Sequence, residues 1–415
     1  MMRVRIHRGA NQIGGSAIEV EAAGSRLLLD CGLPLDGDPD DDTLLPDMPG
    51  LRTQDASLLG IVLSHGHRDH WGLIPKARAD IPVFMGAATE RILCAAAPFV
   101  PGAATMQAAG HLVDGQPLAL GPFTVTPYLV DHSAFDAYAL LVEADGKRLF
   151  YSGDLRAHGR KHALFDRMLR HPPEAIDTML MEGSSIGRLA AHESFPTEKE
   201  IERKLVASMR AASGMVLVAA SAQNIDRVVS IYRAAKRTGR TLLVDLYAAE
   251  ILRATGRDSI PQTHWPDVAL FTPHRQRVMV RDREMFELLD RHKVGRVFPE
   301  DLAATPARFV VLYRHAFYRD LVRAGCLGGA VAVWSQWAGY LAQPYGAAAV
   351  SALEAQGVPV ETIHTSGHAS IADLKRLIEA VVPRQLVPIH SFEPQRFGEF
   401  FRDVVQRQDG EWWEV

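Results

Sequence analysis

Short runs of alternating apolar and polar residues dominate the first third of the chain. Many of their apolar members are β-branched, and glycine-containing turns separate the runs, which is the pattern of strands joined by hairpins. Strands are predicted at residues 3–7, 17–21, 26–30, 60–63, 82–85, 123–130, 138–142, 148–151 and 178–181, and a helix at 87–96. Hairpin-linked strands at this density indicate antiparallel or mixed sheets rather than a doubly wound parallel sheet.

The pattern changes after Glu182. Residues 197–211 predict a helix, because Pro196 and Thr197 can start it and acidic residues fill its first turn. An apolar strand at 215–219 and an amphipathic helix at 225–237 follow. Further strands are predicted at 241–244, 330–334, 360–364 and 386–389, and further helices at 347–356 and 371–381. The β-α-β rhythm up to residue 334 is typical of a small parallel-sheet domain.

These two patterns predict one domain that is interrupted by another. Residues 1–190 would form the first part of the outer domain, residues 191–345 the inserted domain, and residues 346–415 the part that completes the outer domain. The chain has 415 residues, 47% hydrophobic and 23% charged, which is ordinary for a globular protein with large cores.

The cysteine content argues against two classes of site. The three cysteines are widely spaced and form no CxxC pair, so neither a disulfide framework nor a thiolate zinc site is predicted. The N-terminus lacks the apolar run of a signal peptide, and no apolar stretch is long enough to span a bilayer. We therefore expect a cytoplasmic protein that does not enter a membrane.

Charge is distributed unevenly along the chain. The net charge is −4, yet residues 185–345 carry 23 Lys and Arg against 16 Asp and Glu. A basic segment in an acidic chain can bind a polyanion. It can equally be an arginine-rich solvated surface of helices, and charge alone does not decide between these interpretations.

The strongest chemical signal follows the strand predicted at 60–63. The segment Ser64-His65-Gly66-His67-Arg68-Asp69-His70 places three imidazoles and a carboxylate where the chain leaves a buried strand. These are ligands that Zn²⁺ prefers. One tetrahedral ion that keeps a position open for water needs only three protein ligands. Four ligands in this short segment therefore indicate two ions that share a water molecule. A merely polar loop would leave this arrangement unexplained.

Three further residues complete a ligand set. His132, Asp154 and His390 each follow an apolar strand, and the carboxylate of Asp154 offers two oxygens that could bridge two ions. Taken alone, each is more often a capping or turn residue; beside the cluster, they are predicted ligands. Asp30 also ends an apolar strand and would orient the ligand imidazoles.

The order and spacing of these residues resemble the metallo-β-lactamase superfamily. Later motifs resemble its β-CASP nucleases: Met181-Glu182-Gly183-Ser184 is similar to their acidic motif A, and Pro388-Ile389-His390-Ser391 to motif C. Ser366-Gly367-His368-Ala369-Ser370 is similar to the motif B histidine of the ribonuclease J group. The resemblance covers nearly the whole chain. It implies an α/β protein, an αββα metallo-β-lactamase sandwich with an inserted β-CASP α/β domain.

The resemblance also implies roles for individual residues. His65, His67 and His132 would hold one Zn²⁺; Asp69, His70 and His390 would hold the other; Asp154 would bridge them, with Mn²⁺ as the alternative ion. The residues implied in catalysis are Asp69, His368, Glu182 and Asp30, with His368 as general acid and Glu182 polarising it. Ser366, Gly367 and Ala369 would bind a substrate phosphate.

The implied function is a metal-dependent ribonuclease that hydrolyses single-stranded RNA, as a 5′→3′ exonuclease with endonuclease activity as well. His390 at motif C is typical of RNA-acting members. The alternatives are a DNA-directed nuclease of the same fold, a small-molecule metallo-hydrolase, which would not need the inserted domain, and a non-catalytic RNA-binding relative, which would be expected to lose ligands. The chain ends at Val415, so it resembles the short forms without a further C-terminal domain; a homodimer is implied only by analogy.

Overall fold

The computed structural model describes residues 1–100 and 105–415. The chain divides into two compact units: unit 1 comprises Met1–Phe195 and Gly367–Val415, and unit 2 comprises Pro196–Ser366. One domain is therefore interrupted by another along the chain.

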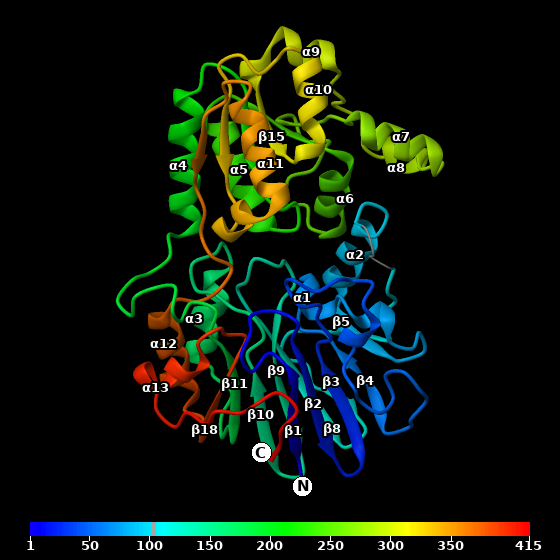
Figure 1. The fold of residues 1–415 in the computed structure, drawn as a ribbon, viewed down its shortest axis with the longest axis vertical. Helices are drawn as coiled ribbons and strands as arrows, with labels where there is room; N and C mark the ends of the chain where they lie inside the picture. Colours follow the sequence, from blue (N-terminus) through cyan, green and yellow to red (C-terminus); the bar gives the residue numbers. More distant parts are fainter. Residues whose placement is uncertain (101–104) are drawn as a thin grey trace. The chain divides into compact units, whose positions relative to one another are not determined.

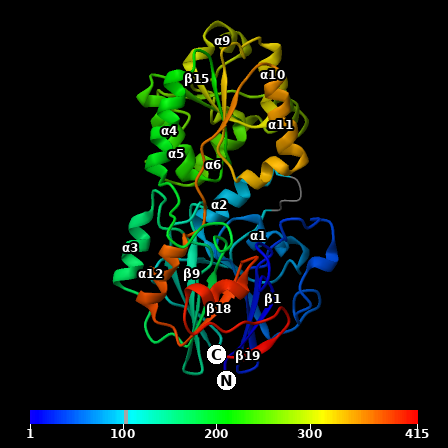
Figure 2. The same cartoon turned by 60° about the vertical axis from the view of Figure 1, so that its left-hand side comes forward.

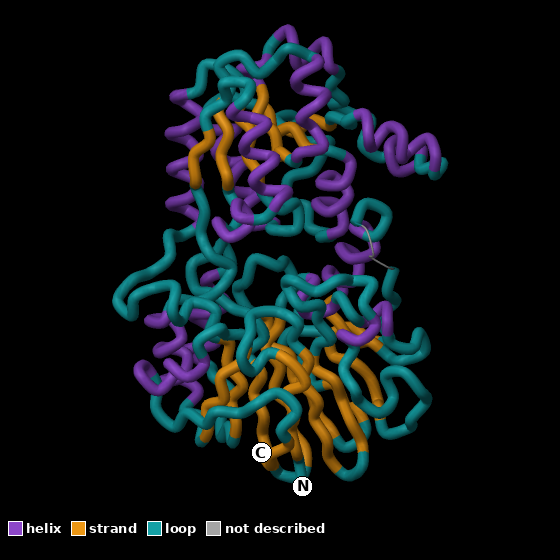
Figure 3. The backbone as a smooth tube through the Cα atoms, in the orientation of Figure 1, coloured by secondary structure: helices purple, strands orange, loops and turns teal. Residues whose placement is uncertain are grey.

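Unit 1 contains two mixed sheets among the described residues (Figures 1 and 3). The seven strands of the first sheet are, in spatial order, β19 (Trp412–Glu414), β1 (Arg3–Arg8), β2 (Ala17–Ala22), β3 (Ser25–Leu29), β4 (Leu58–Val62), β5 (Val83–Gly86) and β6 (Gly110–Leu112). The six strands of the second sheet are β18 (Gln385–Ile389), β11 (Thr178–Glu182), β10 (Lys147–Tyr151), β9 (Tyr138–Ala144), β8 (Phe123–Leu129) and β7 (Leu118–Leu120). Both sheets combine parallel and antiparallel pairs, which confirms the prediction of mixed sheets.

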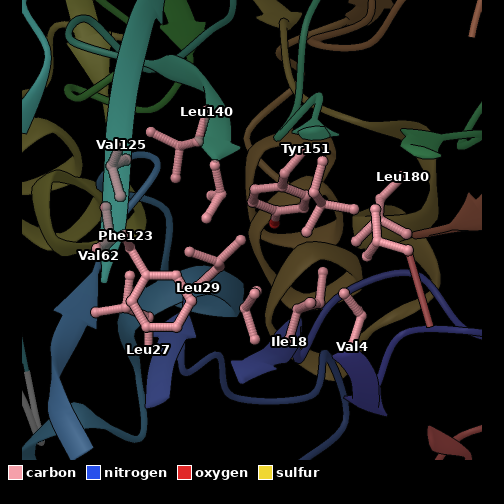
Figure 4. Packing of buried hydrophobic residues seen from close by; sticks show 14 of the residues in the cluster. Val4, Ile18, Leu27, Leu29, Val62, Phe123, Val125, Leu140, Tyr151 and Leu180 are labelled. Atoms are coloured by element: carbon pink, nitrogen blue, oxygen red, sulfur yellow. The ribbon is translucent and has the colours of Figure 1, made fainter. Parts of the chain in front are cut away.

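The two sheets pack face to face through one apolar core (Figure 4). Alternate residues of a strand point to the same face, so Val4, Ile18 and Leu27 of the first sheet contribute to this core together with Leu140 and Leu180 of the second. All five side chains are buried. This packing makes the two sheets the inner layers of unit 1.

Helices form the outer layers. The second sheet is covered by α3 (His162–Arg170), α12 (Ile371–Val381) and α13 (Phe397–Phe400), which pack in a separate apolar cluster. Residues of α1 (Arg68–Trp71) and α2 (Ala87–Ala96) pack in another cluster with the outer face of the first sheet. The αββα sandwich is therefore confirmed.

The two ends of the chain lie side by side in unit 1 (Figure 2). β19 pairs antiparallel with β1, and Trp413 is buried in the core between the sheets. Trp412 and Trp413 of this strand thus fasten the C-terminal tail to unit 1.

Unit 2 is built on a sheet whose six described strands all run parallel. Their spatial order is β14 (Val268–Leu270), β13 (Thr241–Val244), β15 (Phe309–Tyr313), β12 (Val216–Ala219), β16 (Val331–Trp334) and β17 (Val360–Thr362). The helices of this unit are α4 (Glu198–Ala211), α5 (Ile225–Arg237), α6 (Leu246–Ala254), α7 (His274–Asp282), α8 (Phe286–Asp290), α9 (Pro299–Ala304), α10 (Tyr318–Arg323) and α11 (Pro344–Glu354). A parallel inserted sheet is what the β-α-β rhythm predicts.

The second boundary between the units differs from the one expected at residue 346. Residues 346–366 belong to unit 2, because β17 pairs with β16 of the parallel sheet and Leu353 of α11 packs in the core of that sheet. Only the chain from Gly367 onward returns to unit 1.

Among the described helices, none has the length and apolar character to cross a membrane. The three cysteines are free thiols.

Arg227 lies in the basic segment 185–345, yet it is not part of the protein surface. Its side chain is fully buried in unit 2. Its guanidinium donates to Glu198 at 2.9 Å and to the hydroxyl and carbonyl of Ser335 at 2.6 and 2.9 Å. It therefore ties α4 and α5 to the carboxyl end of β16.

Replacing Arg227 alone is expected to destabilise unit 2. Arg227→Met would leave the carboxylate of Glu198 buried without its guanidinium partner, at a cost of roughly 3–5 kcal/mol in the free energy of unfolding. Urea denaturation would measure this loss. The double variant Arg227→Met/Glu198→Leu should recover most of it, because an apolar pair of similar volume carries no buried charge. Equal losses in the single and double variants would contradict this account.

Candidate metal centre

The strand directions of unit 1 explain why residues from distant parts of the sequence meet. β3 runs parallel to β4, and β10, β11 and β18 run parallel to one another. β8 runs in the same direction as β10, because both pair antiparallel with β9. The carboxyl ends of these strands therefore lie at one edge of each sheet, and the polar residues that follow them converge there.

All seven side chains predicted as ligands fall in two groups at this edge. The first comprises His65, His67 and His132, and the second comprises Asp69, His70, Asp154 and His390. Within each group the candidate ligand atoms lie within 4.8 Å of one another. The structure thus brings the seven residues predicted as ligands together, with Asp154 grouped with Asp69, His70 and His390.

Asp154 lies between the two groups. Its Oδ2 atom is 3.7 Å from Nε2 of His65 and 4.0 Å from Nε2 of His132 in the first group. It is also 3.3 Å from Nε2 of His70 and 3.6 Å from Nε2 of His390 in the second. A carboxylate in this position can serve both groups at once.

Unsatisfied polar atoms show that the cluster fits metal ions. Nε2 of His65, His70 and His390 and Oδ1 of Asp154 are buried and make no hydrogen bond within the described protein. A buried polar atom without a partner costs free energy, and nitrogen and oxygen donors of this kind are what Zn²⁺ coordinates. Metal coordination would satisfy these atoms.

The environment keeps most of the imidazoles neutral. Burial, together with the neighbouring His70 and His132, lowers the pKa of His65 well below its ordinary value. Burial likewise lowers the pKa of His67 to about 4 and that of His132 well below its ordinary value. A neutral imidazole has the lone pair that a metal needs. His70 differs, because the carboxylates of Asp154, Asp30 and Asp69 outweigh its burial and raise its pKa.

Asp30 orients the ligand cluster through several hydrogen bonds. Its Oδ2 lies 2.7 Å from Nδ1 of His70 and accepts from the Tyr151 hydroxyl at 2.6 Å. Both its oxygens also accept from Ser64, at 2.7 Å each. Asp30 and His390 have φ angles of +60° and +50°, a strained region for residues other than glycine that concentrates at functional sites.

Asp30→Asn is therefore expected to weaken metal binding without removing a ligand. The amide would lose the charge that holds Nδ1 of His70 in its donor form, so Nε2 would be a poorer ligand. Removing such an orienting carboxylate typically lowers metal affinity about 10- to 100-fold. Competition with a chromogenic zinc chelator would measure the change. Affinity that matches wild type would show that Asp30 only stabilises the fold.

Two elements of the site were not foreseen from sequence. Nδ1 of His132 lies 2.7 Å from the carbonyl of Gly367, which fixes its tautomer and leaves Nε2 to face the cluster. The buried pair Asp131–Arg156, with Nε to Oδ1 at 3.1 Å, joins the loop of His132 to the loop of Asp154. A hydrogen bond from the Arg156 amide to the Asp131 carbonyl reinforces this link.

His368 lies at the side of the cluster and contacts Glu182. Nδ1 of His368 is 3.1 Å from Oε2 of Glu182 and 3.8 Å from Oδ2 of Asp154. Burial alone would lower the pKa of His368, but the charges of Glu182 and Asp154 raise it to about 9. Glu182 is fully buried and is held by the amides of Leu155 and Ser184. These two carboxylates therefore favour the protonated form of the imidazole.

The three residues implied in phosphate binding are placed differently. Ser366 is the last residue of unit 2, and Gly367 is the first residue of the returning segment of unit 1. Gly367 contacts His132 as described, and the Ala369 side chain is buried in the cluster beneath α12. Their role in phosphate binding stays a prediction.

Comparison with known proteins agrees with this geometry. Residues 25–200 match the family model of a beta-lactamase superfamily domain, and residues 357–396 match that of a Zn-dependent metallo-hydrolase RNA specificity domain. Ribonuclease J of Mycobacterium tuberculosis is 28% identical, over 94% of this chain and 68% of the relative. Ribonuclease J of Helicobacter pylori is 22% identical, over 92% of this chain and 55% of the relative.

A solved structure shares the whole fold. A protein of unknown function from Enterococcus faecalis superimposes with a TM-score of 0.79 over 99% of both chains, at 21% sequence identity.

Proposed function

This chain is a metallo-hydrolase of the metallo-β-lactamase/β-CASP family and is related to ribonuclease J; from that premise, we propose that it is a ribonuclease with two zinc ions that hydrolyses phosphodiester bonds of single-stranded RNA. Its main mode would be 5′→3′ exonucleolytic, with endonucleolytic cleavage as a second mode. One observation carries the proposal. The Asp154 carboxylate lies 3.7 Å from His65 of the first ligand group and 3.3 Å from His70 of the second, in a chain that also matches an RNA specificity domain.

The chain's own residues suggest how such a site would work. His65, His67 and His132 would hold one ion and Asp69, His70 and His390 the other, with Asp154 between them. When bound, the ions supply Lewis acidity and a water of lowered pKa. The Asp30 carboxylate would keep His70 in the ligating tautomer. His368, oriented by Glu182, would donate its proton to the leaving 3′ oxygen.

RNA cleavage and its salt dependence test the proposal. Purified protein loaded with Zn²⁺ or Mn²⁺ would be incubated with single-stranded RNA and matching DNA, each with a 5′-monophosphate or a 5′-triphosphate. We expect mononucleotides from the 5′ end of RNA, and a KM that rises steeply with salt because polyanion binding releases counterions. Hydrolysis of a small phosphodiester such as bis(p-nitrophenyl) phosphate should change little with salt.

Each alternative outcome has a distinct meaning. Internal RNA fragments alone would make the enzyme an endonuclease with the same chemistry. Cleavage of DNA alone would favour the DNA-directed alternative. Intact RNA and DNA beside active hydrolysis of the small ester would leave a small-molecule metallo-hydrolase. If metal-loaded protein hydrolyses none of these substrates, the proposal is wrong.

A further inference from the structure

The carboxyl edge of the parallel sheet in unit 2 carries side chains that the metal centre does not use. In register across this edge, Ala219 of β12 pairs with Tyr313 of β15 on one side and with Trp334 of β16 on the other. Residues that follow these strands therefore emerge along one line. In open parallel sheets, this edge is where ligands bind.

Three aromatic rings follow β16 at this edge. Trp337, Tyr340 and Tyr345, here called the aromatic strip, form a continuous series with ring centroids 5.3 Å apart for the first pair and 6.3 Å for the second. Trp337 is 36% exposed and Tyr345 52% exposed, so ring surface is available to a ligand. Trp334, by contrast, is buried in the core of unit 2. Its role is therefore packing, and it is not part of the strip.

Two glycines allow these rings to pack closely against the local backbone. A Cβ atom at Gly339 would lie 2.4 Å from the indole of Trp337, and one at Gly346 would lie 2.0 Å from the Tyr340 carbonyl oxygen. Only glycine fits either position without displacing the strip. The ring planes of Trp337 and Tyr340 are nearly perpendicular, at 81°. A flat ring can therefore pack against the face of one of them and the edge of the other.

One arginine lies at the same edge. Arg314 follows β15, is paired with the buried Asp245, and stacks over the Tyr247 ring at 4.6 Å. Its side chain is 33% exposed, so it is fixed and also reachable. β15 and β16 are separated by β12, which places them about 10 Å apart. Unit 2 as a whole carries 22 Lys and Arg against 17 Asp and Glu.

We propose that the aromatic strip of Trp337, Tyr340 and Tyr345 stacks the unpaired bases of single-stranded RNA, while Arg314 contacts its phosphates. This inference rests on the proposed function and adds a base-stacking subsite to it. Bases stack on aromatic side chains with little preference for sequence. The subsite therefore selects unpaired RNA over duplex, whose bases are not available to it.

Competition between intact and abasic RNA tests the strip directly. The metal-loaded full chain would cleave a labelled RNA in the presence of an unlabelled oligomer, either intact or with the same ribose-phosphate backbone and no bases. In wild type we expect the intact oligomer to compete about 5- to 150-fold better, the range that stacking of one base contributes. In Trp337→Ala this preference should largely disappear. The inhibition constant of the intact oligomer and the KM for intact RNA should rise, while the inhibition constant of the abasic oligomer should change little.

Two further variants separate stacking from a structural effect. Trp337→Phe keeps a ring and should recover most of the preference. Phe286→Ala removes a ring that is 54% exposed on α8, an element that projects from the body of unit 2 in Figure 1, and should behave like wild type. Hydrolysis of bis(p-nitrophenyl) phosphate should be equal in all variants, because it reports only the metal centre.

The outcomes distinguish this inference from the proposed function. If wild type cleaves RNA and Trp337→Ala retains its preference for intact RNA, the subsite is wrong and the function stands. A changed oligomeric state in Trp337→Ala with an unchanged preference would instead assign the strip to protein contact, and would also overturn the subsite. If wild type hydrolyses the small ester but no RNA, the proposed function fails and the inference fails with it.

Discussion

Asp154→Asn is expected to reduce phosphodiester hydrolysis by roughly a thousandfold or more. Among the residues that the structure describes, Asp154 is the one whose carboxylate lies within 4.0 Å of imidazoles from both ligand groups. In the proposed two-ion site, an amide in its place would remove a negative charge that offsets the charge of the cations and would leave one weak oxygen donor. Bound ions of this kind would lower the pKa of a coordinated water from 15.7 to about 7, so loss of a ligand that serves both would affect the reaction itself.

Metal content and fold must be measured together with activity. We expect the Asp154→Asn variant to bind fewer than two zinc ions per chain by mass spectrometry of the metals, with a wild-type circular dichroism spectrum. Asp36→Asn, which changes an exposed aspartate of unit 1, is the matched control and should retain full metal content and activity. A variant with two bound ions and wild-type turnover would show that Asp154 does not bridge the ions.

Strand-end positions explain why the sequence could indicate which residues meet at the candidate metal centre. His65, His132, Asp154 and His390 each follow an apolar run that the structure confirms as a buried strand. The long periodic elements were also predictable: helices Ala87–Ala96, Ile225–Arg237 and Ile371–Val381 have the predicted bounds. In these segments the local pattern and the tertiary environment demand the same structure.

Features that depend on pairing in space were not predictable. Residues 346–366 look like part of the outer domain until the pairing of β17 with β16 is known. Arg227 lies in a basic segment, and only the folded structure shows that it is buried and bonded to Glu198 and Ser335. The link between Asp131 and Arg156 joins two loops, and neither residue has a local signal. Strands β6 and β7 have three residues each, which is too short for a recognisable alternation.

His368→Ala is expected to lower kcat for RNA about 100- to 10,000-fold, which is the usual contribution of a general acid. The residue lies outside both candidate ligand groups, so metal content should match wild type. Its contact with Glu182, at 3.1 Å, predicts that Glu182→Gln shares part of the loss, since the amide no longer stabilises the imidazolium. The double variant should be no worse than His368→Ala alone, because the two residues act as one unit.

The leaving group provides the decisive test of this role. A 3′ oxygen of RNA needs a proton as it departs, whereas p-nitrophenolate leaves readily without one. His368→Ala should therefore hydrolyse bis(p-nitrophenyl) phosphate at close to the wild-type rate while it loses RNA cleavage. His111→Ala is the matched control, because His111 forms a similar contact with Glu90 at 2.7 Å but is not part of the cluster. Equal losses on both substrates would show that His368 supports the metal centre rather than donating the proton.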